Sequence, residues 1–169
     1  MDEFLDVYDV NGKYLGIKSR SFCHTGSPGV YHKPVCIWFK NSKGEILVQK
    51  RAKCKKTEPN KWDFSAAGHP IAGEGPIEAA LREIKEELGL EFQPTDLHFL
   101  KETLEPTLWE FVQIYIIYTD AKISDMTLQQ EETQDVRWVT YKEFCDLLYS
   151  NEFCDHPKSL KDLMANLLK

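Results

Sequence analysis

The chain has 169 residues, of which 42% are hydrophobic and 28% are charged, a length and balance typical of one globular domain. Its 27 acidic and 21 basic residues give a net charge of −6, which argues against general nucleic-acid binding because that binding depends on cationic neutralisation of phosphates. The acidic N-terminus and the short apolar runs exclude a secretion signal and a membrane span. We therefore expect a soluble, single-domain, cytoplasmic protein.

The five cysteines are consistent with that compartment. They are odd in number, widely spaced and contain no CxxC pair, so neither a disulfide framework nor a zinc cluster is expected. We expect all five to be reduced and to behave as small hydrophobic residues. They are Cys23, Cys36, Cys54, Cys145 and Cys154.

The N-terminal half alternates β-prone runs with turns. The Asn-Gly pair at Asn11 and Gly12 is a strong local signal for a hairpin. Polar and lysine-rich stretches with proline or glycine are typical of loops. In chain order, the pattern predicts a hairpin over 5–16, a second hairpin over 35–50, a loop over 52–61, a short strand over 62–67 and a glycine-rich loop over 69–75.

The C-terminal half begins with a helix over Pro76–Leu88. Proline is favourable in the first turn of a helix, and Gly89 stands where glycine closes one. The pattern then predicts strands over 98–102, 110–118 and 135–139, and helices over 141–149 and 157–168. Interspersed helices and strands indicate an α/β fold with a mixed sheet. The leucines of the helical extension, about 141–169, either pack on the domain or form a partner or homodimer surface.

The helix over Pro76–Leu88 carries two different faces. At about 100° per residue, one apolar stripe is predicted for the core, and it consists of Ile77, Leu81, Ile84 and Leu88. Glu83, Glu86 and Glu87 crowd another face, where a divalent cation such as Mg²⁺ or Mn²⁺ would remove their mutual repulsion. On the helix alone, the alternative is a solvated charged face.

The residues around the helix favour the metal. Their order is Gly68, Glu74, Arg82-Glu83-Ile84, Glu86-Glu87 and Gly89-Leu90. This matches every specified position of the Nudix box, so the chain resembles a Nudix hydrolase over roughly 35–148. The resemblance implies an α/β/α sandwich around a mixed β-sheet, with residues 1–169 forming a single Nudix hydrolase domain.

The resemblance also implies an activity, namely metal-dependent hydrolysis of a diphosphate linkage in a nucleoside diphosphate derivative or a related small molecule. Glu83, Glu86 and Glu87 would hold Mg²⁺ or Mn²⁺, with the Gly68 carbonyl completing the site. Arg82 would hold a carboxylate in position, and Glu74 would tie the loop to the helix. The general base would be a box glutamate or one on a later loop, for which the candidates are Glu131 and Glu132.

Two further stretches, 44–51 and 64–70, look like one branch of the family, which includes isopentenyl-diphosphate isomerase and isomerase-like hydrolases. His24, His32 and His69 match the isomerase's histidine metal site, with Glu110 as a fourth ligand. The alternative is that His24 and His32 are ordinary surface residues. The isomerase needs a cysteine where this chain has Ala67, and alanine cannot transfer a proton, so isomerase activity is disfavoured.

Donors for an anionic substrate lie in the loop before the box. Matching the same branch, Arg51 with Lys55 or Lys56 is expected to bind the diphosphate. Three aromatic residues are candidates to stack on a nucleobase, namely Trp62, Trp109 and Phe111, whereas Trp38 and Trp138 are expected to pack in the core. A non-catalytic nucleotide-binding Nudix module is disfavoured because such modules lose box carboxylates and this chain keeps them all.

Overall fold

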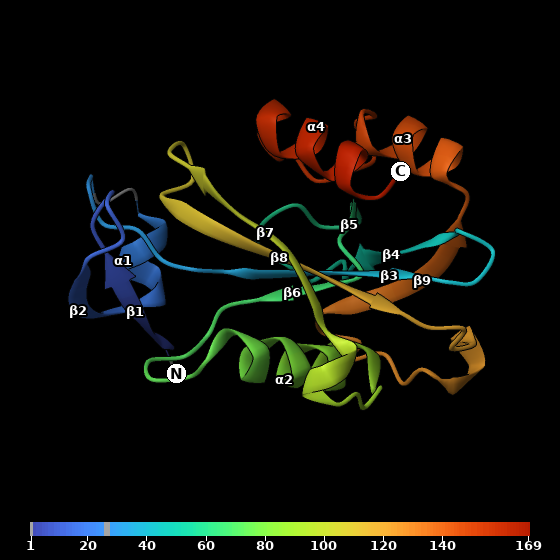
Figure 1. Cartoon of the computed structure of the whole chain (residues 1–169), viewed down its shortest axis with the longest axis horizontal. Coiled ribbons are helices and arrows are strands. Elements are labelled where there is room, and N and C mark those ends of the chain that lie inside the picture. Colours follow the sequence, from blue (N-terminus) through green and yellow to red (C-terminus); the bar gives the residue numbers. More distant parts are fainter. Residues whose placement is uncertain (1, 26–27) are drawn as a thin grey trace.

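The computed structural model describes residues 2–25 and 28–169, which form three layers (Figure 1). Helix α2 (Pro76–Leu88) covers one face of a seven-stranded sheet, while α3 (Tyr141–Leu148) and α4 (Lys158–Leu167) cover the other. The predicted α/β fold with a mixed sheet is therefore confirmed. No helix in the described part of the chain is long and apolar enough to cross a membrane.

The central sheet has the strand order β5-β4-β3-β8-β7, with β6 paired to β3 and β9 paired to β4. Its strands are β3 (Val35–Lys40), β4 (Ile46–Arg51), β5 (Trp62–Asp63), β6 (Ala66–Gly68), β7 (His98–Glu105), β8 (Glu110–Tyr118) and β9 (Thr133–Val139). Among the strand pairs of the described residues, β3–β8 is the parallel one. Because helices cover both faces, the central strands are nearly continuous apolar runs, such as the buried first five residues of β3.

The predicted strand over 62–67 is wrong as a single element. Its first part is β5, which pairs with β4, and its last part is β6, which pairs with β3. Between them Ser65 links the diverging strands: its Oγ accepts from the backbone N of Phe39 at 2.8 Å and donates to the backbone O of Leu47 at 2.6 Å. The crossing carries the chain toward α2 and delivers Gly68 and His69 there.

The first predicted hairpin is confirmed as β1 (Phe4–Tyr8) and β2 (Tyr14–Ser19), which form a separate two-stranded sheet. It is followed by a short helix, α1 (Arg20–His24), which the sequence did not indicate. The backbone N of Ala72 donates to the Phe4 carbonyl at 2.8 Å, and that of Gly73 donates to Asp6 Oδ2 at 2.9 Å. These bonds attach the hairpin to the loop that precedes α2.

Helix α2 has the predicted bounds, and Gly89 closes it in the left-handed conformation with φ 68°. Its apolar stripe is only partly as predicted. Ile84 and Leu88 are buried, but Ile77 is 39% exposed, because it lies in the first turn of the helix, where its neighbours Pro76 and Glu78 are exposed as well. Alanines that the pattern omitted complete the buried face, together with Glu87.

The C-terminal helices pack on the domain, as one of the two alternatives predicted. Their buried residues join the core on the sheet face opposite α2, and they are Phe144, Leu147, Leu148, Leu160, Met164 and Leu168. Trp38 is fully buried and Trp138 is partly buried against the other core cluster, so both pack as expected. Two short 3-10 turns lie at Pro94–Asp96 and Ile123–Asp125. All five cysteines are free.

Candidate active site

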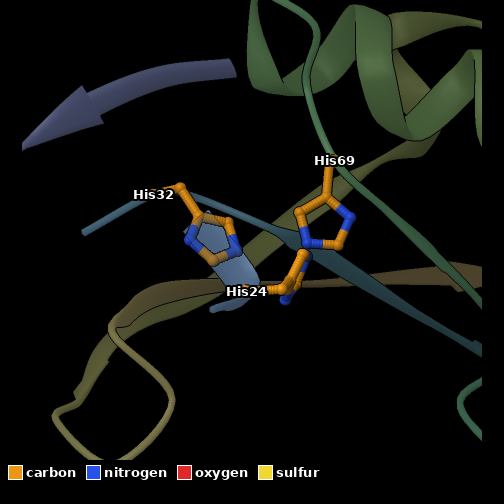
Figure 2. Close-up of side chains that lie close together, drawn as sticks. All are labelled: His24, His32 and His69. Carbon is orange, nitrogen blue, oxygen red and sulfur yellow. The ribbon is translucent and has the colours of Figure 1, made fainter. Parts of the chain in front are cut away.

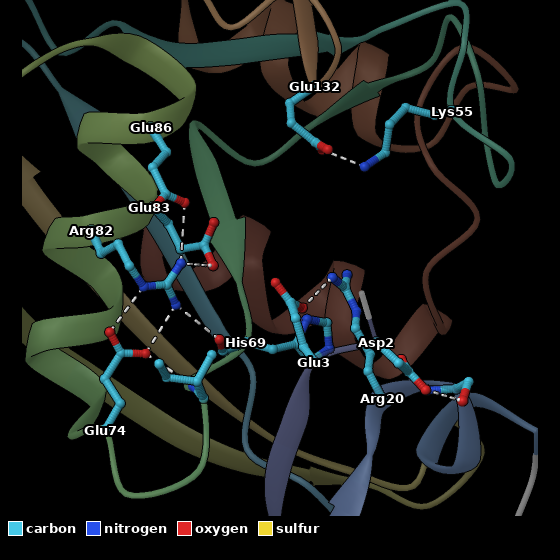
Figure 3. Close-up of polar contacts among 12 residues, drawn as sticks. Asp2, Glu3, Arg20, Lys55, His69, Glu74, Arg82, Glu83, Glu86 and Glu132 are labelled. Carbon is cyan, nitrogen blue, oxygen red and sulfur yellow. Dashed lines mark hydrogen bonds and ion pairs between the residues drawn. The ribbon is translucent and has the colours of Figure 1, made fainter.

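Arg82 lies at the centre of the carboxylates on α2 (Figure 3). Its Nε and Nη2 donate to the two oxygens of Glu74, each at 2.9 Å. Its Nη1 donates to Glu83 at 2.9 Å and to Glu86 at 3.2 Å, and Nη2 also reaches the His69 carbonyl at 3.1 Å. Hydrogen bonding to Arg82 lowers the pKa of Glu74. Arg82 therefore fixes the loop, the helix and two carboxylates in one arrangement.

Glu87 is the most buried of the box carboxylates, with 6% of its surface exposed. Its Oε2 accepts from the backbone N of Ala67 and from Gln49 Nε2, both at 3.2 Å. Burial raises the pKa of Glu87 to about 8, and the charge of Glu83 adds to that effect. Burial also raises the pKa of Glu83, although Arg82 opposes it. One guanidinium thus leaves this group of acids incompletely neutralised, which favours a bound cation.

Gly68 is required by a close approach to the same acids. A Cβ built on Gly68 would lie 2.0 Å from Glu83 Cδ, so any side chain at this position would displace the Glu83 carboxylate. The Gly68 backbone and the carboxylates Glu83, Glu86 and Glu87 line one cavity of about 190 Å³. Hard oxygen donors grouped around a small cavity are the ligand set that Mg²⁺ and Mn²⁺ prefer. The residues present therefore fit a divalent cation.

Only one of the two candidate bases lies in this cavity. Glu132 lines it and forms an ion pair with Lys55. Glu131 is exposed and lines neither this cavity nor the second cavity that adjoins it. The register of the turn before β9 therefore brings Glu132, not its neighbour, to the carboxylates.

A second cavity, of about 170 Å³, adjoins the first and shares Gly68, Glu87 and Glu132 with it. Of the predicted diphosphate-binding residues, Arg51 and Lys55 line this cavity, whereas Lys56 is exposed outside it.

Arg20 also lines both cavities, and sequence reasoning missed it. It lies on α1, far along the chain from the box, and Glu3 Oε2 holds its Nη1 at 2.8 Å. No local pattern in the sequence marks that position.

The structure does not support nucleobase stacking by the predicted aromatic residues. Trp62 is buried beneath the Arg137 guanidinium, which lies 4.2 Å from the ring centre. Phe111 is buried, and Trp109 packs against Tyr31 with ring centres 5.3 Å apart. None of these three residues lines either cavity, and the aromatic residue that does is Phe64.

The three predicted histidines come together from separate segments. His24 ends α1, His32 precedes β3 and His69 follows β6, and their rings face one another (Figure 2). Ring centres lie 5.0–5.1 Å apart, and each residue offers a ligand atom within 4.8 Å of the others. His32 Nε2 lies 3.3 Å from Glu110 Oε1. The alternative that His32 is an ordinary surface residue is wrong, since it is 1% exposed.

The histidine cluster carries unused hydrogen-bonding capacity. Among the described residues, both ring nitrogens of His69 and Nδ1 of His32 are buried without a hydrogen-bond partner, while His32 Nε2 lies 3.3 Å from the Glu110 carboxylate. Burial lowers the pKa of His69 well below its usual range and, with the charge of His32, lowers that of His24. Neutral imidazoles with free lone pairs are the ligands that divalent transition metals prefer. These residues also fit a metal ion.

Comparison with known proteins agrees with this geometry. The family model described as the NUDIX domain matches residues 30–163. The chain is 41% identical over 128 residues to an uncharacterised Nudix hydrolase of Listeria monocytogenes, covering 75% of this chain and 74% of that protein. It is 28% identical over 148 residues to an isopentenyl-diphosphate Δ-isomerase of Escherichia coli, covering 86% and 78%. A crystal structure from Deinococcus radiodurans shares the fold, with a TM-score of 0.77 at 23% identity, covering 99% of this chain and all of that one.

The fold and the box helix define a diphosphate-hydrolysing class of enzyme. The chain belongs to the Nudix hydrolase family. Members of this family hydrolyse nucleoside diphosphate derivatives and generally need a divalent metal ion such as Mg²⁺ or Mn²⁺.

Proposed function

We propose that this chain hydrolyses the diphosphate linkage of a small nucleoside diphosphate derivative or related compound, with Mg²⁺ or Mn²⁺ held by Glu83, Glu86 and Glu87 and by the Gly68 carbonyl. The observation that carries the proposal is the grouping of Glu83, Glu86 and Glu87 at the wall of one cavity, with Arg82 bonded to the first two. When bound, the cation neutralises phosphate charge and lowers the pKa of attacking water.

The chain's own residues supply the remaining chemistry. Arg51 and Lys55 line the substrate cavity and bind the diphosphate oxygens. Lys55 pairs with Glu132 in the absence of substrate. When Lys55 turns to a phosphate, Glu132 is released to accept the proton of the attacking water.

A second metal site is proposed at His24, His32 and His69, with Glu110 as fourth ligand. Three buried ring nitrogens without a polar partner support it, namely Nδ1 of His32 and both nitrogens of His69, since leaving such groups unpaired is unfavourable. The cluster takes a divalent transition metal in preference to Mg²⁺, because imidazole is a softer ligand than carboxylate.

Two alternatives are less well supported. The Escherichia coli relative is named an isomerase. Isomerase activity is less well supported for this chain, because Ala67 has no side chain that can transfer a proton. A non-catalytic nucleotide-binding module would have no use for the complete set of acids. One domain over residues 1–169, a cytoplasmic location and homodimer formation stay predictions.

The test is a screen of nucleotides, dinucleotides, sugar nucleotides and prenyl diphosphates, with Mg²⁺ or Mn²⁺ and with excess EDTA. We expect metal-dependent release of phosphorylated products from at least one compound, and its loss in Glu86→Gln and Glu87→Gln. Glu91→Gln is the matched control, because Glu91 is an exposed acid just past α2 that pairs with Lys85. Unchanged turnover in both box variants would remove these residues from the mechanism. Conversion of isopentenyl to dimethylallyl diphosphate at enzyme-like rates would favour the isomerase.

A further inference from the structure

Glu87 has one of its two carboxylate oxygens already occupied by donors from the sheet. Its Oε2 accepts from the backbone N of Ala67 on β6 and from the side-chain amide of Gln49 on β4, both at 3.2 Å. Within residues 2–25 and 28–169 no hydrogen bond reaches Oε1, although Glu87 lines both cavities of the site. Oε1 is therefore the oxygen that is left for a cation.

Gln49 is a buried polar residue, with 3% of its surface exposed. Its amide has two unlike ends, an NH₂ group that donates hydrogen bonds and an oxygen that accepts them. Only the NH₂ end can bond to a carboxylate, because the other end would place two acceptor oxygens against each other. The amide must therefore keep one orientation if it is to hold Glu87 in place.

Thr133, at the start of β9, supplies the bond that sets this orientation. Its side chain is fully buried, and its hydroxyl donates to the side-chain oxygen of Gln49. A donor at the oxygen end of the amide leaves the NH₂ end facing Glu87. Hydrogen bonds therefore run in one direction, from the Thr133 hydroxyl through the Gln49 amide to the Glu87 carboxylate.

The turn before β9 places Thr133 next to the candidate base Glu132. The Gln129 carbonyl accepts from the backbone N of Glu132 at 2.9 Å and from that of Thr133 at 2.8 Å, while Gln129 N donates to the Glu87 carbonyl at 3.2 Å. One turn, bonded to the helix that carries Glu87, thus brings the Glu132 side chain to the cavity and the Thr133 side chain to the interior.

We propose that Gln49 and Thr133 are positioning residues for the metal: Gln49 holds Oε2 of Glu87 so that Oε1 faces the cation, and Thr133 holds Gln49. This inference rests on the metal site of the proposed function and adds two residues outside the box helix to it. Side chains that hydrogen-bond to a metal ligand orient that ligand, and their removal costs about 10- to 100-fold in metal affinity or activity. The alternative is that both residues only fill the interior.

The experiment measures Mg²⁺ binding to the whole chain by isothermal titration calorimetry, which needs no substrate. Mg²⁺ is chosen because it prefers oxygen ligands to imidazole, which keeps the histidine cluster out of the measurement. Gln49→Met keeps the length of the side chain but removes both ends of the amide, and we expect the Kd for Mg²⁺ to rise about tenfold.

Thr133→Val removes the hydroxyl at nearly constant size. We expect it to raise Kd about threefold, because the amide stays in place but loses its preference for one orientation. Thr133→Ser restores the hydroxyl and should bind Mg²⁺ as wild type does, even where the lost methyl group lowers Tm. Gln134→Met is the matched control, since the Gln134 amide bonds to Asn60 and lines neither cavity, and it should leave Kd unchanged.

A double variant distinguishes positioning from packing. If Thr133 acts through Gln49, then Gln49→Met with Thr133→Val should bind Mg²⁺ like Gln49→Met alone, because residues that act in series are not additive. Additive losses would overturn the role of Thr133. A lower Tm with unchanged Kd in both single variants would overturn the whole inference in favour of packing.

Failure of the proposed function gives a different result. Absence of Mg²⁺ binding by wild type would overturn the carboxylate metal site and this inference with it. Mg²⁺ binding that depends on Gln49, without turnover of any compound in the substrate screen, would overturn the hydrolase function and support the positioning role.

Discussion

The carboxylate site on α2 and the histidine cluster meet at neighbouring residues, Gly68 and His69, but they balance charge in opposite ways. Glu74, Glu83 and Glu86 share the one guanidinium of Arg82, so a single positive charge faces three carboxylates. In the histidine cluster, burial lowers the pKa of His24 and His69, and the ring nitrogens of His69 lack hydrogen-bond partners. In the proposed arrangement, one fold holds a hard-cation site beside a softer one, because the end of β6 would supply the Gly68 carbonyl to the first and the His69 imidazole to the second.

The largest expected effect is the loss of hydrolysis in Gly68→Ala, which should disturb the carboxylate site and leave the histidine cluster intact. Gly68→Ala places a methyl group 2.0 Å from the Glu83 carboxyl carbon, so Glu83 must move, and misplacement by about 1 Å costs about 100-fold in rate. We expect kcat/KM for metal-dependent hydrolysis to fall by about that factor. Co²⁺ binding by the histidines, followed by visible absorption, should persist and serves as the internal control. Loss of both would mean that the two sites form one structural unit.

The next prediction is the reverse experiment. His69→Phe keeps a ring in place but removes two nitrogens, and we expect the Co²⁺ spectrum to disappear while Mg²⁺-dependent turnover falls less than in Gly68→Ala. The reason is that the bond from Arg82 to residue 69 uses the backbone carbonyl, which the substitution retains. His98→Phe, on the exposed β7, should leave the Co²⁺ spectrum unchanged. An equal loss of turnover in the Gly68 and His69 variants would make the two metals partners in one reaction.

The sequence predicted the first site better than the second for a physical reason. The box carboxylates and Arg82 lie on one helix and the loop before it, so local spacing fixes their geometry. The histidines come from three segments, and only the resemblance to a known family joined them. Arg20 was not predicted at all. It reaches the cavities through a tertiary pairing, that of the N-terminal hairpin with the loop over 69–75, which no local periodicity records.

In the fold as well, features set by local sequence were predicted and features set by tertiary pairing were not. Helix α2 was predicted to the residue because its proline and glycine mark both ends. The strand over 62–67 failed because its ends pair with different neighbours, and Ser65 makes the crossing through side-chain hydrogen bonds. The burial of Glu87 could not be predicted from its charge. It follows from the position of Glu87 beside the apolar face of α2, in hydrogen-bond reach of β6 and β4.

The smallest expected effect is on the stability of the fold, which the buried Glu87 carboxylate lowers at high pH. The pKa of Glu87 rises from 4.5 to about 8 in the folded chain, chiefly through burial. A raised pKa means that the folded state binds the proton more tightly than the unfolded state does. The stabilising effect is therefore present below pH 4.5 and is lost as the pH rises toward 8. Glu87→Gln mimics the protonated form, so without metal its Tm should match that of wild type at low pH and exceed it by several degrees above pH 8, at about 2–4 °C per kcal/mol.

Adding Mg²⁺ should reverse the order of the Tm values of wild type and Glu87→Gln. Such a reversal would link the instability caused by the buried acid to metal binding. Saturating Mg²⁺ stabilises only the chain that binds it, so at pH 9 wild type should gain Tm on adding Mg²⁺ and Glu87→Gln should gain much less. Differential scanning calorimetry with Mg²⁺ or EDTA measures both differences, and Glu91→Gln, which alters an exposed acid, should follow wild type in each. If Glu87→Gln were less stable than wild type in EDTA at pH 9, the buried carboxylate would be a structural anchor. The uncompensated negative charge of the acids would then no longer support a bound cation at this site.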